Sequence, residues 1–133
     1  MTRFLVVSDS FKGALSSVHA GSAIAEGIRM AAVDAAVHVF PAADGGEGTA
    51  EAIDAALAGK IRRITVSDPF GYPVRASYSD LGLRDGLHTA VFDMASCAGL
   101  GLTRLHGPDP TVASTYGVGE MITALCRAGF HRI

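Results

Sequence analysis

AVHVFPAADGGEGTAEAIDAAL, residues 36–57, contains the strand-to-helix transition that decides the fold. AVHVF alternates as a strand does, and GEGTAEAIDAALAG, residues 46–59, predicts a helix that Gly59 ends. The Gly-Gly pair between them costs roughly 1 kcal/mol or more of backbone entropy relative to alanines. A positive φ angle, or the close approach of a ligand to the main chain, would account for that cost.

The residues upstream show the same order of elements. RFLVV, residues 3–7, is a short apolar run typical of a strand covered on both faces, and it ends at the polar segment SDSFKG, residues 8–13. SVHAGSAIAEGIRMAAV, residues 17–33, predicts a helix capped by Ser16 or Ser17. Strand, helix, strand, helix predicts a right-handed parallel βαβ core, with both polar loops at the carboxyl edge of the sheet.

The pattern changes from Lys60 onward. KIRRITVSD, PVRASYSDLGL and LHTAVFDM predict strands joined by turns, which indicates a mixed or antiparallel β portion. SCAGLGLTRLHGPDP, residues 96–110, is predicted as a loop, and STYGVGEMITALCRAG, residues 114–129, as a helix. The chain is therefore predicted to be α/β, with a βαβα part over residues 1–63 and a β-rich start of a second domain, plus a helix, over residues 64–133.

Composition excludes several classes of function. The 133 residues are 49% hydrophobic, enough for the core of one domain, and the net charge of -2 predicts no nucleic-acid partner. The sequence has no apolar run of membrane-spanning length and no signal peptide, so we expect a cytoplasmic protein without a membrane partner. Cys97 and Cys126 form no metal or redox motif and are predicted to be reduced and buried.

The segment ADGGEGT, residues 43–49, combines acidic side chains with three glycines. Main-chain N–H groups at the start of a helix favour an anion, so a phosphate or carboxylate would fit there. Asp44 could hold Mg²⁺ or orient a hydroxyl. The alternative is purely structural: Asp44 caps the helix, Glu47 complements its dipole in the first turn, and the glycines make a tight turn.

Three more polar residues, Asp9, Ser10 and Lys12, follow the first strand and are expected at the same edge as Asp44. Phosphoryl transfer needs a cation on the phosphate oxygens, a carboxylate-held Mg²⁺ and a positioned acceptor hydroxyl, and these residue types can supply them. A lysine in such a place is otherwise simply solvated.

Other motifs are weaker. The chain has no Walker-type phosphate loop, no dinucleotide fingerprint, and no metal-binding spacing among its histidines. Ser114 and Thr115 could bind an anion with the helix that follows them, or could serve only as its cap.

Five blocks occur in an order that resembles the bacterial glycerate kinases of the first type: VSDSFKGALSS, PAADGGEGT, DPFGYPVRA, DMASCAGL and STYGVGEMITAL. The resemblance implies a two-domain α/β kinase with a discontinuous Rossmann- or flavodoxin-like domain, which transfers phosphate from ATP, with Mg²⁺, to D-glycerate. It also implies that nine residues line the cleft. These are Asp9, Ser10, Lys12, Asp44, Gly45, Gly46, Glu47, Gly48 and Thr49.

The sequence departs from the family pattern in two respects. Glutamate is usual where Asp93 stands, and serine is usual where Ala98 stands, so the block around them is not assigned to the site. The family also continues beyond the end of this chain with another glycine-rich block. We therefore expect an N-terminal portion of a kinase that is inactive alone, exposes apolar surface, and self-associates or requires a C-terminal segment. The rival functions are a non-enzymatic anion-binding module and a phosphatase-like hydrolase that uses Asp9.

Overall fold

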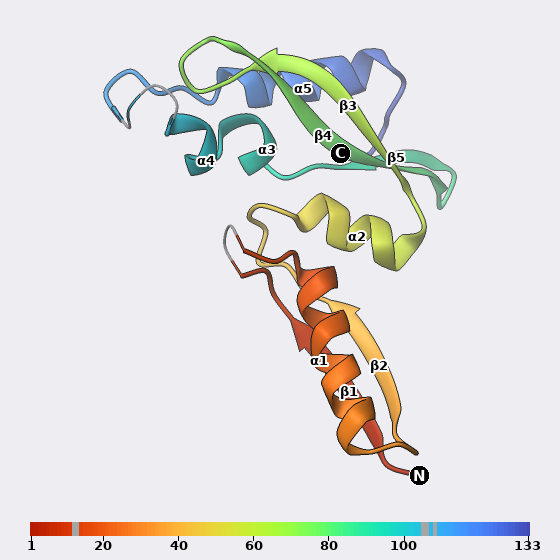
Figure 1. Cartoon of the computed structure of the whole chain (residues 1–133). Helices are drawn as coiled ribbons and strands as arrows, with labels where there is room; N and C mark the ends of the chain where they lie inside the picture. Colours follow the sequence, from red (N-terminus) through yellow and green to blue (C-terminus); the bar gives the residue numbers. More distant parts are fainter. Residues whose placement is uncertain (12–13, 105–106, 108) are drawn as a thin grey trace.

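A computed structural model describes residues 1–11, 14–104, 107 and 109–133, and its elements fall into two groups (Figure 1). The first group is β1 (Arg3–Ser8), α1 (Ser17–Ala31), β2 (Ala36–Pro41) and α2 (Thr49–Leu57). The second group is β3 (Lys60–Ser67), β4 (Pro73–Arg84), β5 (Leu87–Val91), α3 (Ala95–Ala98), α4 (Leu100–Thr103) and α5 (Tyr116–Arg127). This arrangement confirms the predicted mixed α/β fold.

The first group contains a parallel pair of strands covered on one face by α1. β1 and β2 pair in register from Arg3↔Ala36 to Ser8↔Pro41, which confirms the predicted parallel βαβ unit. Ser16 caps α1 by accepting a hydrogen bond from the His19 N–H at 3.3 Å. A Cβ at Gly21 would lie 2.5 Å from Cγ1 of Val39, so the helix approaches the strand more closely than an alanine would allow.

The other face of this pair is open. Successive side chains of a strand point to opposite faces, so Leu5 and Val7 lie on the face away from α1. They are 65% and 60% exposed, and Phe40, the register partner of Val7, is 58% exposed. The expectation that RFLVV is covered on both faces is wrong for this chain, and the expected exposed apolar surface is present here.

The second group is built on the antiparallel sheet β3–β4–β5. One face of this sheet packs on α5 and α3, where Met121 and Cys97 are both 0% exposed and Leu125 is 1% exposed. Seven buried residues form this core. They are Val66, Ala76, Ala90, Cys97, Met121, Leu125 and Phe130. Near the end of the chain, Arg132 makes an isolated parallel bridge with Thr89.

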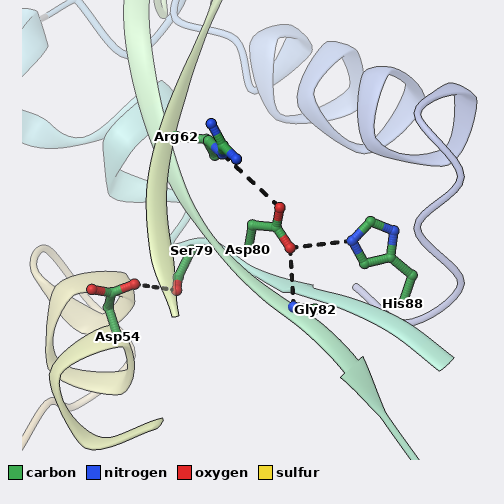
Figure 2. A network of polar contacts seen from close by, with 6 residues as sticks. All are labelled: Asp54, Arg62, Ser79, Asp80, Gly82 and His88. Carbon is green, nitrogen blue, oxygen red and sulfur yellow. Dashed lines mark hydrogen bonds and ion pairs between the residues drawn. The ribbon is translucent and has the colours of Figure 1, made fainter. Parts of the chain in front are cut away.

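α2 lies on the opposite face of the β3–β4–β5 sheet, between that sheet and the β1–β2 pair (Figure 1). Figure 2 shows that two neighbouring residues of β4, Ser79 and Asp80, make polar contacts on opposite faces of this sheet. The Ser79 hydroxyl donates to Oδ1 of Asp54 in α2 at 2.7 Å. Asp80 points the other way and approaches Nε2 of His88 at 3.1 Å and Nε of Arg62 at 4.0 Å.

Asp80 also occupies a break in the strand register, because β4 is irregular between Asp80 and Gly82. Burial acts to raise the pKa of the Asp80 carboxyl, but the Gly82 N–H bond at 3.0 Å, His88 and the charge of Arg62 together hold it below its usual value. His88 in turn stacks on Phe130 with ring centroids 4.0 Å apart. Through His88 of β5, this network connects Phe130, near the end of the chain, to Asp80 of β4.

Two sequence-based expectations about the second group are wrong. The predicted loop over residues 96–110 contains most of α3 and all of α4, because short helical turns follow β5 despite the glycines. Cys97 is buried as expected, and that burial raises the pKa of its thiol, but Cys126 is exposed on the outer side of α5.

Over the described ranges, no helix is long and apolar enough to cross a membrane.

Candidate functional site

The loops after β1 and β2 leave the same edge of the parallel pair. Ser8 pairs with Pro41, and the Ala42 N–H donates to the Ser8 carbonyl at 3.0 Å. The two strands are therefore paired up to their carboxyl ends. Asp9 follows β1 directly, and Asp44 stands three residues after the end of β2. The structure therefore brings the two predicted loops together at the carboxyl edge, where α/β sheets bind their ligands.

The residues 44–49, called here the glycine segment, form a tight turn that requires glycine. Gly45 and Gly48 have φ angles of 92° and 88°, in the left-handed region. Oδ1 of Asp44 accepts from the Gly46 N–H at 2.8 Å, and the Thr49 hydroxyl donates to the Gly46 carbonyl at 2.8 Å. The left-handed backbone conformation thus explains why glycines stand here despite their cost in backbone entropy.

This geometry corrects the purely structural interpretation of the segment. The N-cap of α2 is Gly48, which has no side chain to cap the helix, so Asp44 is not the helix cap. Glu47 lies before the helix, and the acidic residue of the first turn is Glu51. Asp44 instead holds the turn from within, and its side chain is exposed at the surface together with that of Glu47.

The first loop is arranged in a similar way. Oδ1 of Asp9 accepts from the Ser10 N–H at 2.6 Å, and Asp9 is exposed while Ser10 is half-buried. Lys12, the predicted phosphate-binding cation, lies outside the described residues. Asp9 and Asp44 therefore each use one carboxylate oxygen, Oδ1, in a local hydrogen bond.

Mg²⁺ is compatible with these two carboxylates. Within the described ranges, no three or more His, Cys, Asp or Glu side chains gather into a group that could hold a metal ion. Mg²⁺ in phosphoryl-transfer sites is commonly bound by one or two carboxylates together with substrate phosphates and water. Asp44 and Asp9 are exposed carboxylates that follow strands at one edge of the sheet, so their chemistry suits a metal bound together with substrate phosphates.

Asp93 is the residue that the sequence analysis missed. It follows β5, is 4% exposed, and its Oδ2 lies 3.4 Å from the N–H of Ala50 in the first turn of α2. Its Oδ1 accepts from the Ser96 N–H at 2.8 Å. The available signal in the sequence is an acidic residue directly after the predicted strand LHTAVF, at a position that departs from the family pattern.

Ser114 and Thr115 stand at the start of α5. The Ser114 hydroxyl accepts from the Tyr116 N–H at 3.0 Å, and both residues line an open groove of about 800 Å³ between β3 and α5. α5 packs on the face of the sheet opposite α2, and in the described part of the chain no hydrogen bond or ion pair joins these residues to Asp9 or to the glycine segment. The N-cap of α5 is Thr115, which makes no side-chain cap hydrogen bond, so of the two residues only Ser114 contacts a main-chain N–H at the start of the helix.

Known proteins resemble this chain in sequence and in fold. Residues 4–133 match the Glycerate kinase family. The chain is 38% identical over 131 residues to "Glycerate kinase" of Bacillus subtilis (strain 168), covering 98% of this chain and 34% of that one. It is 39% identical over 127 residues to "Glycerate 2-kinase" of Escherichia coli (strain K12), covering 96% of this chain and 32% of that one.

A solved structure agrees with the sequence comparisons. The crystal structure of a protein described as glycerate kinase 2 from Salmonella typhimurium LT2 matches with a TM-score of 0.73 at 35% identity, over 98% of this chain and 34% of that one. The chain thus spans about a third of the length of the relatives it matches. With a family match over almost its whole length, the chain belongs to the glycerate kinase family.

Proposed function

We propose that this chain contributes to the ATP-dependent phosphorylation of D-glycerate. The observation that carries the proposal is the glycine segment, held in a turn with two left-handed glycines after β2, at the same carboxyl edge from which Asp9 follows β1. Left-handed glycines let a ligand approach main-chain N–H groups closely, as phosphate groups require. Family membership makes a phosphoryl donor and glycerate the ligands to test first.

In this proposal each residue has a limited task. The main-chain N–H groups of the glycine segment bind phosphate oxygens, with the side chains of Ser10 and Thr49 at the rim. Asp44, with Asp9 beside it, would hold Mg²⁺, which neutralises phosphate charge when it is bound. Lys12 is proposed to contact a phosphate, and Ser114 and Thr115 remain predicted anion-binding residues. A cytoplasmic location and the lack of a nucleic-acid or membrane partner stay predictions.

The test is a chimera in which this chain replaces the corresponding third of the Bacillus subtilis glycerate kinase. We expect glycerate-dependent consumption of ATP and formation of phosphoglycerate by the chimera, and none by the 133-residue chain alone. Phosphoryl transfer requires donor and acceptor to be held together in one cleft. A folded chimera that hydrolyses ATP without glycerate would favour the phosphatase-like alternative, and binding without turnover would favour the anion-binding module.

Asp44→Asn in the chimera separates the proposed role from a structural one. Asparagine can still accept the Gly46 N–H bond of 2.8 Å, so the turn and the stability should change little. Loss of the carboxylate charge should lower kcat by roughly two orders of magnitude or more. Activity within a fewfold of the unsubstituted chimera would mean that Asp44 only shapes the turn.

A further inference from the structure

The first turn of α2 is satisfied by a side chain from the second group of elements. The first N–H groups of a helix have no partner within it, and the N-cap Gly48 supplies no side chain. Asp93 takes this role across the fold, with Oδ2 3.4 Å from the N–H of Ala50. Ala50 is 0% exposed and Asp93 is 4% exposed, so this contact is shielded from water.

α2 is held to the second group at two further points. Asp54 accepts from the Ser79 hydroxyl at 2.7 Å in the middle of the helix, and Nη2 of Arg84 donates to the Leu57 carbonyl at 2.6 Å at its C-terminus. A carboxylate at the N-terminus and a guanidinium at the C-terminus both complement the helix dipole. α2 is therefore held at its start, middle and end to β4 and to the chain that follows β5.

The negative charge of Asp93 opposes the binding of an anion by the main-chain N–H groups in the first turn of α2. A phosphate at a helix N-terminus uses the N–H groups of the first turn and the positive end of the dipole. At α2 a protein carboxylate already lies there, and repulsion between like charges is strong where water is excluded. No ion pair joins Asp93 to a cation among the residues that the structure describes.

We propose that Asp93 is a positioning residue that holds the first turn of α2, directly after the glycine segment, to the chain that follows β5, and that it closes the N-terminus of α2 to phosphate. Phosphate groups are then bound upstream of the helix by the main-chain N–H groups of Gly45, Glu47 and Gly48, because the Gly46 N–H already donates to Oδ1 of Asp44 at 2.8 Å. The second part, the closure of the α2 N-terminus to phosphate, rests on the proposed function, because it concerns where the phosphates of ATP lie. The positioning of α2 by Asp93 does not depend on the proposed function.

The positioning role is tested by amide hydrogen exchange in the 133-residue chain. Asp93→Ala removes the acceptor, so exchange at the Ala50 amide should become about tenfold faster or more. Asp93→Asn keeps an oxygen acceptor and should restore exchange to within about threefold of the wild type. Asp54→Asn is the matched control, because it makes the same charge change at a carboxylate that contacts Ser79 and not the Ala50 N–H, and it should leave exchange at Ala50 unchanged.

The closure is tested by titrating inorganic phosphate into the wild type and Asp93→Ala while following the backbone amide resonances. We expect no shift at Ala50 or Glu51 in the wild type, and a shift at both in Asp93→Ala, where the charge and the acceptor are both gone. A phosphate-induced shift at Ala50 in the wild type, or none in a folded Asp93→Ala or Asp93→Ser, would overturn the closure.

Unchanged exchange at Ala50 in Asp93→Ala would overturn the positioning role. If that variant does not fold, Asp93→Ser takes its place, because the shorter serine side chain holds its hydroxyl farther from the Ala50 N–H than the present 3.4 Å. Unchanged Ala50 exchange in Asp93→Ser would then overturn the role. A wild type that binds no phosphate at residues 45–48 counts against the proposed function alone, because the exchange result is independent of any ligand.

Discussion

The two sheets of this chain bury their apolar side chains in different ways. The antiparallel sheet β3–β4–β5 packs on α5 with large buried residues such as Met121 and Leu125. The parallel pair β1–β2 packs on α1 through small residues, Ala20 and Ala25, and leaves Leu5 65% exposed on its other face. We therefore infer that the second group contributes most of the free energy of unfolding, because large buried side chains remove the most apolar surface from water. Self-association through the open face stays a prediction.

The strongest test of this comparison uses one substitution in both regions. Leu125 is 1% exposed and Leu5 is 65% exposed, so truncation to alanine leaves a cavity only at the first. We expect Leu125→Ala to lower the free energy of unfolding by about 2–5 kcal/mol. Leu5→Ala should change it by about 0.5 kcal/mol or less. Urea denaturation of both variants measures this, and similar losses would show that the two regions do not differ.

A pair of glycines in α1 tests the packing of the first group. A Cβ at Gly21 would meet Cγ1 of Val39 at 2.5 Å, whereas nothing lies within 4 Å of one at Gly27. We expect Gly21→Ala to destabilise the protein by about 1–3 kcal/mol through overpacking. Gly27→Ala should stabilise it by up to about 1 kcal/mol, since alanine is the better helix former. If thermal unfolding shows both variants stabilised, α1 does not pack closely on β2.

The smallest expected effect concerns the Asp80 network of the second group. The pKa of Asp80 is lowered in the folded protein, so its contribution is present above the unfolded value of about 3.9 and is lost as pH falls through the folded value. We expect Asp80→Asn to cost about 0.5–1 kcal/mol at pH 7 and less at pH 3. The measurement is urea denaturation at both pH values.

The control for that prediction is Asp85→Asn. The Asp85 side chain is 85% exposed and lies 3.4 Å from Arg132, so this exposed ion pair should contribute little at either pH. A loss at Asp80 that is the same at pH 3 and pH 7 would contradict the assignment of its effect to ionisation.

Local patterns in the sequence determined most of the elements. The apolar run RFLVV, the alternation of AVHVF and the strands after Lys60 were found because side-chain periodicity follows directly from backbone geometry. The parallel order of β1 and β2 follows from the helical crossover that joins them, and parallel strands place Asp9 and Asp44 after carboxyl ends at one edge of the sheet. The glycines of residues 44–49 predicted positive φ angles, and two of them have these angles.

Contacts between residues far apart in the chain were decided only by the tertiary structure. Asp93 and Ala50 are separated by 43 positions, and nothing local to either one indicates that a carboxylate completes the first turn of α2. Periodicity places Cys126 on a helix but does not say which side of α5 faces the sheet. The physical reason is the same in both cases: secondary structure is set by interactions within a few residues, whereas burial, capping across the fold and access of a ligand depend on which surfaces pack together.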